Sequence, residues 1–189
     1  MTFSDLNLDS RVLEAIDAMG YEYPTSIQQH VIPAILQGRD LIATAQTGTG
    51  KTAAFLLPII HELVSVSAED FAVRALIIAP TRELVQQIDQ QFNGMAYFAG
   101  LSSIAVYGGG EGGDWERQKM SMIRGAEMVI ATPGRMLSHL HLGYLDLSKV
   151  RFLVLDEADR MLDMGFHEDI MNILSYLPAK RQNLMFSAT

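Results

Sequence analysis

The sequence predicts a three-layer α/β domain, in which a mainly parallel β-sheet is covered by helices on both faces. Short apolar runs that suit buried strands alternate with longer segments that suit helices. Some of these runs are almost continuously apolar, which is typical of strands buried on both faces of a parallel sheet. The chain has 189 residues, about half of them hydrophobic, so one domain can enclose a sizeable core.

Composition excludes several classes of protein. Cysteine is absent, so neither a disulfide framework nor a thiolate metal site can form. We find no secretory signal and no apolar run that approaches the ~20 residues of a membrane span, so a cytoplasmic protein without membrane association is expected. The net charge of −8 is unfavourable for a nucleic-acid binder. Either nucleic acid is not the partner, or the contacts are few and local, or the basic surface lies elsewhere.

The first 37 residues predict a helical N-terminal flank. Residues 3–19 suit a short segment followed by one helix, and the turn residues at 20–24 end it. A second helix is expected over residues 27–36, capped by Thr25 or Ser26.

A phosphate-binding loop follows this flank. It consists of Ala45, Gln46, Thr47, Gly48, Thr49, Gly50, Lys51 and Thr52. An apolar run at 40–44 precedes the loop and a helical pattern follows it, which is the context of a phosphate loop. Lys51 would reach the β- and γ-phosphates, and the Thr52 hydroxyl would hold Mg²⁺. Ala45 stands where the general motif has glycine, so an ordinary glycine turn is the alternative.

A candidate partner for this loop ends a later strand. The apolar run at 150–155 leads into Asp156-Glu157-Ala158-Asp159. A carboxylate at the tip of a central strand can hold Mg²⁺, and the next one can orient or deprotonate the attacking water. The alternative is a solvated acidic loop, but two independent motifs in the expected order favour nucleotide hydrolysis.

The remaining elements keep the same alternation. Strands are expected at 73–79, 103–107, 127–131 and 183–186, and helices at 53–64, 81–98, 114–124, 134–141, 161–164 and 167–176, with a polar connection at 65–71. Ligands of such sheets bind at the carboxyl ends of the strands, so one working edge is expected. The unusual strand-end residues are Pro80-Thr81-Arg82-Glu83, Gly108-Gly109-Gly110, Thr132-Pro133-Gly134-Arg135, the acidic quartet and Ser187-Ala188-Thr189.

Taken together, these strand ends resemble the first RecA-like lobe of DEAD-box RNA helicases over essentially the whole chain. The acidic quartet matches the tetrad that names the family, and 45–52 matches its phosphate loop, including the alanine in first place. Residues 80–84, 132–135 and 187–189 match three further motifs in family order. The resemblance implies a RecA-like P-loop NTPase lobe at 38–189 that uses ATP and Mg²⁺, with the second helicase lobe absent from this sequence.

The flank also resembles the adenine-reading motif of that family, with Phe3 as its upstream aromatic residue. The match is Gly20-Tyr21-x-x-Pro24-Thr25-x-Ile27-Gln28. The Gln28 amide can both donate to and accept from an adenine edge, and Tyr21 or Phe3 can stack on the base. The alternative is a helix cap at Thr25 with Gln28 on the surface.

By resemblance, RNA would be held through its backbone with little sequence preference. The implied contacts are Pro80, Thr81, Arg82, Gly108, Gly109, Thr132, Pro133, Gly134 and Arg135. N–H groups at helix starts bind phosphate oxygens, while Arg82 and Arg135 add charge or pin local structure. Such few contacts are compatible with an acidic domain. Asp159 would tie the tetrad to other motifs, and Ser187 and Thr189 would couple nucleotide state to lobe closure.

Two stretches are not explained by the family. Gly110–Arg117 is longer than the usual spacing and contains Trp115, for which packing as a loop anchor is favoured over stacking on a base. His139 and His141 suggest a metal pair, but no third ligand is obvious, so a solvated helix end is favoured.

The chain alone is expected to be monomeric, to bind nucleotide and to hydrolyse it slowly. Arginine fingers, worth roughly 10³–10⁵ in turnover, would come from the absent lobe. The rival functions are a different P-loop enzyme, such as a DNA helicase or a small-molecule kinase, and a non-catalytic clamp. The adenine motif and residues 80–84 argue against the first, and the intact Lys51, Asp156 and Glu157 argue against the second.

Overall fold

Six strands form one sheet in the order β1-β6-β5-β2-β4-β3, and every neighbouring pair is parallel. The computed structural model describes residues 1–46, 48–65, 72–109 and 114–188. Thr47, Thr189 and two segments of the predicted connections, 66–71 and 110–113, lie outside the described residues. The parallel sheet confirms the predicted fold class, which is that of a RecA-like domain.

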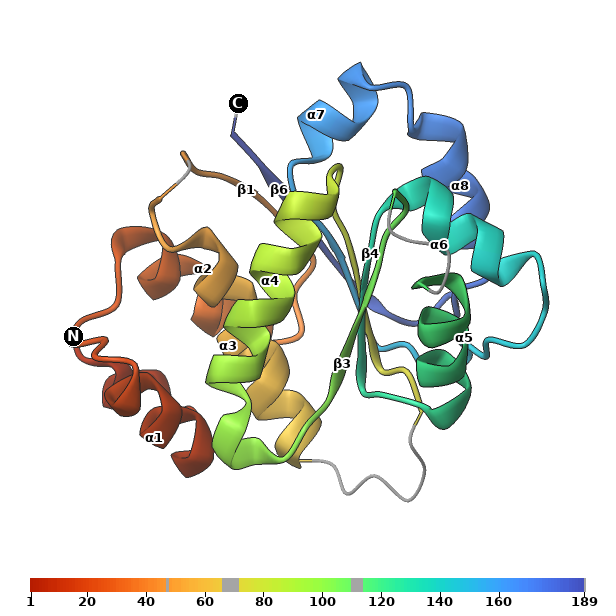
Figure 1. The fold of residues 1–189 in the computed structure, drawn as a ribbon. Helices are drawn as coiled ribbons and strands as arrows, with labels where there is room; N and C mark the ends of the chain where they lie inside the picture. The colour runs from red at the N-terminus through yellow and green to blue at the C-terminus, as the bar shows by residue number, and fades with distance from the viewer. Residues whose placement is uncertain (47, 66–71, 110–113, 189) are drawn as a thin grey trace.

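The elements follow the predicted alternation (Figure 1). The strands are β1 Leu41–Thr44, β2 Ala75–Ile78, β3 Ser103–Val106, β4 Met128–Ala131, β5 Phe152–Leu155 and β6 Gln182–Ser187. The helices are α1 Ser10–Ala18, α2 Ser26–Leu36, α3 Lys51–Ser65, α4 Arg82–Met95, α5 Asp114–Arg124, α6 Pro133–Leu140, α7 Ala158–Asp163 and α8 His167–Ser175, with 3₁₀ turns η1 Phe3–Leu6 and η2 Tyr97–Ala99.

The sheet separates two apolar cores, so the fold has three layers. On one face α1 to α4 pack, and their buried residues include Ile32 of α2 and Phe55 of α3. On the other face α5 to α8 contribute residues such as Met136 of α6 and Met161 of α7. Figure 1 shows the first four helices on one side of the sheet and α5, α6 and α8 on the other. β2, β4 and β5 are buried along their whole length, as their apolar runs predict.

Some helix boundaries differ from the predicted ones. The helix predicted over 81–98 ends at Met95, and the separate turn η2 follows before Gly100, whose φ of +66° stops the chain from continuing as a helix. The helix predicted at 161–164 starts earlier, at Ala158, within the acidic quartet that follows β5. In the part of the chain that the structure describes, no helix is long and apolar enough to cross a membrane.

Candidate active site

The phosphate loop and the acidic quartet meet at one edge of the sheet. The register pairs Thr44 with Ser187 and Leu155 with Met185, so β1, β6 and β5 end close together. The loop after β1 leads into α3, whose first residue is Lys51, and Asp156 follows β5 directly. The Nζ atom of Lys51 lies 3.2 Å from Oδ1 of Asp156. The structure therefore brings together the two motifs that the sequence places about a hundred residues apart.

Both charged groups of this pair are buried. Asp156 is 1% exposed and Lys51 is 7% exposed. Burial raises the pKa of Asp156 above its ordinary value, and the charge of Lys51 and the Glu157 N–H, which donates to Oδ1 at 2.9 Å, oppose that rise. Apart from the ion pair, Nζ of Lys51 has no hydrogen-bond partner among the described residues. A buried ammonium group with spare donors is suited to an anionic ligand such as a phosphate.

Gly50 packs closely against residues of the flank. Its φ is +85°, which L-residues with a side chain rarely adopt, and an added Cβ would lie 2.5 Å from Nε2 of Gln28. That Nε2 atom donates to the Gly50 carbonyl oxygen at 3.0 Å. The loop is therefore packed directly against the adenine-motif helix.

A cavity of about 440 Å³ joins these groups. Its lining includes Phe3, Tyr21 and Gln28 from the flank, and Lys51, Thr52 and Asp156 from the phosphate end. The volume lies in the range of small-molecule and cofactor sites. Sequence reasoning missed Gln87 and Gln91, which also line it from α4. Gln87 and Gln91 are four residues apart, so they lie on the same face of α4, and α4 begins within the predicted motif at residues 80–84. That spacing could have identified them from the sequence.

The adenine motif is folded as a helix cap against the loop. Gln28 is buried, with 3% exposure, so the alternative of a surface glutamine is wrong. Its Oε1 atom accepts from the Thr25 backbone N–H at 2.9 Å, while its Nε2 atom holds Gly50. One lone pair and one N–H of the amide remain for a ligand. Phe3 and Tyr21 stack on each other with ring centroids 6.5 Å apart.

Glu157 occupies a left-handed backbone conformation, with φ of 51° and ψ of 48°. This region is uncommon for residues with a side chain, and such strain clusters at functional sites. The turn directs the chain from β5 into α7. The Glu157 carboxylate is half-buried, and its Oε2 atom accepts a hydrogen bond from Nη1 of Arg160 at 3.1 Å. Its Oε1 atom makes no hydrogen bond to a side chain among the described residues.

The donor set suits a magnesium ion only together with phosphate oxygens. Among the described residues, no group of three or more His, Asp or Glu side chains could hold a metal by itself. Magnesium in nucleotide sites is held by one or two protein ligands, phosphate oxygens and water, which needs no such cage. The buried Asp156 carboxylate and the neighbouring Thr52, which line the same cavity, fit that pattern.

The residues predicted to touch RNA lie at the ends of the adjacent strands β2, β4 and β3. Thr81 caps α4 by accepting from the Leu84 N–H at 3.3 Å, and Thr132 is the N-cap of α6. Arg82 donates from Nη1 to the Gly109 carbonyl at 2.9 Å and lies over the Tyr107 ring. Arg82 therefore pins the turn after β3, one of the two roles predicted for it. The other motif members behave differently: Pro80 and Pro133 are buried, whereas Gly108 and Gly134 are exposed.

The structure confirms the predicted packing of Trp115 and corrects the prediction for His139. Trp115 lies in the first turn of α5 rather than in the loop before it, and its ring stacks on His139 with centroids 3.9 Å apart. His139 is fully buried, whereas His141 is exposed, so the pair is not a solvated helix end. The burial of His139 could not be predicted from periodicity, because it depends on the contact between His139 on α6 and Trp115 on α5.

Of the three residues predicted to couple the lobes, the structure describes Ser187 and Asp159. Ser187 ends β6, and its carbonyl oxygen accepts from the Ala45 N–H at 3.0 Å, which attaches the loop to this strand. Asp159 is half-buried in the first turn of α7. Gln46, Gly48 and Thr49 complete the described part of the loop, where the Thr49 hydroxyl donates to the Gln46 carbonyl at 2.7 Å.

Comparison with known proteins assigns the family. The model of the DEAD/DEAH box helicase family matches residues 25–189. The chain is 48% identical to the ATP-dependent RNA helicase CshA of Listeria monocytogenes, over 99% of this chain and 35% of that protein. It is 47% identical to the ATP-dependent RNA helicase DeaD of Mycobacterium tuberculosis, over 100% of this chain and 32% of that protein. For DeaD of Escherichia coli the identity is 45%, over 100% of this chain and 29% of that protein.

The chain thus spans about a third of the length of these curated relatives. The family model covers most of the chain, from the adenine motif to the last strand. The same segment contains the buried Lys51–Asp156 pair and the strained Glu157 turn. This chain belongs to the DEAD/DEAH box helicase family.

Proposed function

We propose that this chain is the ATP-binding lobe of an ATP-dependent RNA helicase. The observation that carries the proposal is the 3.2 Å contact between Lys51 and Asp156, inside a cavity that the adenine-motif residues also line. A triphosphate held there would touch both the loop and the acidic strand. Its base would lie toward the flank, within reach of the free positions on the Gln28 amide and of the rings of Tyr21 and Phe3.

Each residue of the phosphate end has a separate role. Lys51 binds the β- and γ-phosphates through the donors that the protein leaves unused. Glycines at 48 and 50 let backbone N–H groups approach the phosphates. Thr52 and Asp156 hold Mg²⁺, which, when bound, neutralises charge on the phosphate oxygens. The raised pKa of Asp156 falls when a cation is bound beside it, so the ionised carboxylate is favoured in the nucleotide complex.

Glu157 orients the attacking water and accepts its proton. One of its carboxylate oxygens is occupied by Arg160, which leaves the other for the water. The left-handed backbone directs this side chain from a fixed turn rather than from a mobile loop.

RNA is the second ligand of this proposal, bound along the ends of β2, β3 and β4. The helix starts at Thr81 and Thr132 present backbone N–H groups, and Gly108 and Gly109 allow close approach of a phosphate backbone. Such contacts are few, which is compatible with a net charge of −8, and they read little sequence. The second lobe, for which the length of the relatives leaves room, supplies the remaining contacts and the arginine fingers.

The test uses Glu157→Gln in the longer protein that contains both lobes, with Glu168→Gln, which changes an exposed side chain of α8, as the matched control. We expect ATP affinity to stay within about two-fold, while RNA-stimulated turnover falls by roughly 10²–10⁴, as expected for loss of a general base. The 189-residue chain alone should bind ATP and turn it over slowly under the same conditions.

Three results would contradict the proposal. Equal turnover in Glu157→Gln and the parent would remove Glu157 from the chemistry. Fast RNA-stimulated turnover by the 189-residue chain would show that no second lobe is needed. Equal stimulation by single-stranded DNA and RNA would favour a DNA helicase or another P-loop enzyme.

A further inference from the structure

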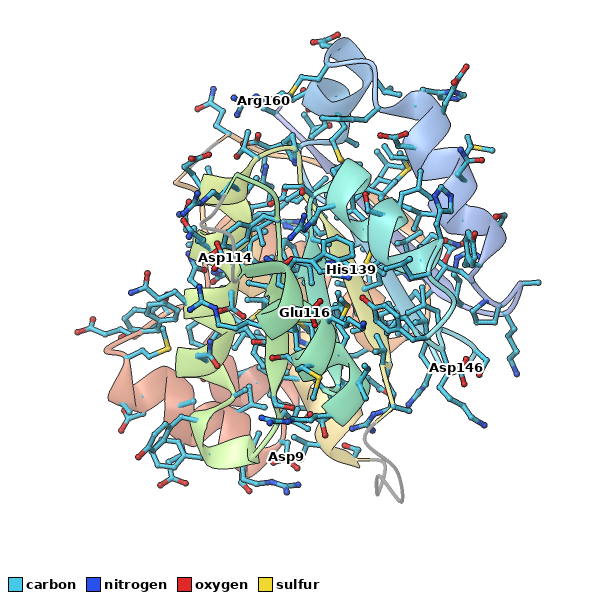
Figure 2. The ribbon with its side chains drawn as sticks, turned by 45° about the vertical axis from the view of Figure 1, so that its right-hand side comes forward. Asp9, Asp114, Glu116, His139, Asp146 and Arg160 are labelled. Atoms are coloured by element: carbon cyan, nitrogen blue, oxygen red, sulfur yellow. The ribbon has the colours of Figure 1, made fainter. Side chains whose placement is uncertain are left out.

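Trp115 is the only tryptophan of the chain, and it is built into a stack of side chains beside the candidate RNA edge. Its indole lies nearly parallel to the His139 ring, at an interplanar angle of 7° and a centroid distance of 3.9 Å. The guanidinium carbon of Arg135 lies 4.2 Å from the centroid of the indole. Figure 2 labels His139, which faces from α6 toward α5.

Arg135 and His139 both pack against the indole. They are four residues apart on α6, so their side chains leave the helix one turn apart. The indole of Trp115 therefore packs against two side chains of α6, one of which is the Arg135 guanidinium.

The Gln118 side chain is hydrogen-bonded to both Arg135 and His139. Its Oε1 atom accepts from Nε of Arg135 at 3.1 Å and lies 3.3 Å from Nε2 of His139, while its Nε2 atom donates to the Tyr107 carbonyl at 3.0 Å. Because Oε1 can only accept, His139 carries its proton on Nε2. Its Nδ1 atom then accepts from the Tyr144 hydroxyl. Burial lowers the pKa of His139 to about 4, so the ring is neutral near pH 7 and stacks on the indole without repelling Arg135.

The guanidinium of Arg135 is held at one edge and open at the other. Nε is bound to Gln118, and among the described residues neither Nη atom makes a hydrogen bond or an ion pair. The side chain is half-buried and leaves α6 in its first turn, next to Thr132 and the exposed Gly134. An arginine fork in this state is preorganised for a phosphate group.

We propose that Trp115 is a positioning residue that holds the Arg135 guanidinium ready to bind a phosphate of single-stranded RNA. This proposal rests on the proposed RNA function, and it explains how the Arg135 side chain is oriented before RNA binds. A free arginine side chain loses rotamer entropy when it is fixed. Stacking on the indole fixes it before RNA arrives, so less of that cost falls on the binding step.

The test measures RNA affinity with a fluorescein-labelled oligouridylate of about ten nucleotides, by anisotropy, on the 189-residue chain. We expect Trp115→Ala to weaken binding about five-fold, which corresponds to about 1 kcal/mol for a cation–π contact. Trp115→Phe keeps an aromatic face and should retain most of the affinity. Tyr176→Ala, which removes an exposed aromatic ring at the end of α8, is the matched control and should bind as the parent does.

A double-mutant cycle separates positioning from direct contact. If Trp115 acts through Arg135, Trp115→Ala adds nothing to Arg135→Ala, and both reduce the slope of log affinity against log salt by up to about 0.7, the value for one phosphate on a single strand. Nucleotide affinity should be the same in all variants. Additive losses would show that Trp115 touches RNA itself. A parallel loss of nucleotide affinity would show a general structural role, and either result overturns the proposal.

Tryptophan emission gives a second measurement that needs no change at Trp115. Because the chain has a single tryptophan, its fluorescence reports this stack alone. RNA should change the emission of the parent but not of Arg135→Ala at equal RNA saturation. An unchanged parent emission at saturation refutes the positioning role while leaving RNA binding intact. If the anisotropy shows no RNA binding by the parent, the proposed RNA function itself fails, and this inference fails with it.

Discussion

His139 gives the protein a defined sensitivity to acid. The ring is 0% exposed, its Nε2–H donates to Oε1 of Gln118, and in the neutral form its Nδ1 accepts from the Tyr144 hydroxyl. Burial, and secondarily the nearby charge of Arg135, lower its pKa from 6.5 to about 4. In the unfolded chain the same ring keeps its ordinary pKa. Between these two values the unfolded state binds a proton that the folded state does not, so the free energy of unfolding falls as the pH falls.

The size of the effect follows from the two pKa values. One unit of difference is worth 1.36 kcal/mol, so the complete shift from 6.5 to about 4 corresponds to roughly 3 kcal/mol below both values. Between pH 7 and pH 5 the loss is about 2 kcal/mol, because at pH 5 the unfolded ring is almost fully protonated and the folded ring is mostly neutral. Above about pH 7 the contribution of His139 no longer changes.

Urea unfolding followed by far-UV circular dichroism at several pH values between 5 and 7 measures this loss. The comparison is between the parent and His139→Phe, which keeps a ring against Trp115 but cannot titrate. His139→Phe is expected to be less stable at pH 7, since Gln118 and Tyr144 lose a partner, but its stability should depend less on pH by about 2 kcal/mol over this range. Equal pH dependence in the two proteins would refute the assigned burial and neutral state of His139.

The remaining predictions concern two backbone positions of the site. Gly50→Ala should lower the free energy of unfolding by about 1 kcal/mol more than Gly48→Ala, because both residues have positive φ but only at Gly50 would a Cβ displace Gln28 and break its bond to the loop. Urea unfolding of the two variants measures the difference, and equal stabilities would show that the Gln28 contact contributes nothing. Glu157→Gly should be more stable than Glu157→Ala by about 1 kcal/mol, because glycine adopts the left-handed conformation without strain. The opposite order in the same assay would contradict the strained turn.

The layered fold was accessible from the sequence for physical reasons. Strands such as β5 are buried on both faces, so they appear as unbroken apolar runs, and the helices between them carry one apolar stripe. The meeting of Lys51 with Asp156 also followed, because parallel strands end at the same edge. Helix ends were less accurate, as at Met95, because they depend on local turns and packing.

The network around Trp115 could not be read from local pattern. Nothing in the sequence near His139 distinguishes a buried ring from a solvated one, since its burial depends on a side chain from α5 that lies on a separate helix. The second role of Gln28 was missed for the same reason: its contact with Gly50 joins two segments that are distant in sequence. Such side-chain pairs arise from how the elements pack, which periodicity does not encode.

The strand order has a consequence for how the domain is made during translation. β1, which leads into the phosphate loop, pairs only with β6, the last strand in the described chain. A nascent chain that lacks residues 182–187 can pair β3 with β4, β4 with β2 and β2 with β5. β1 then lacks its partner strand. We therefore expect the candidate nucleotide site to form only after residues 182–187 have been synthesised, and ribosome-bound intermediates that lack them should lack nucleotide affinity even when the other strands are folded.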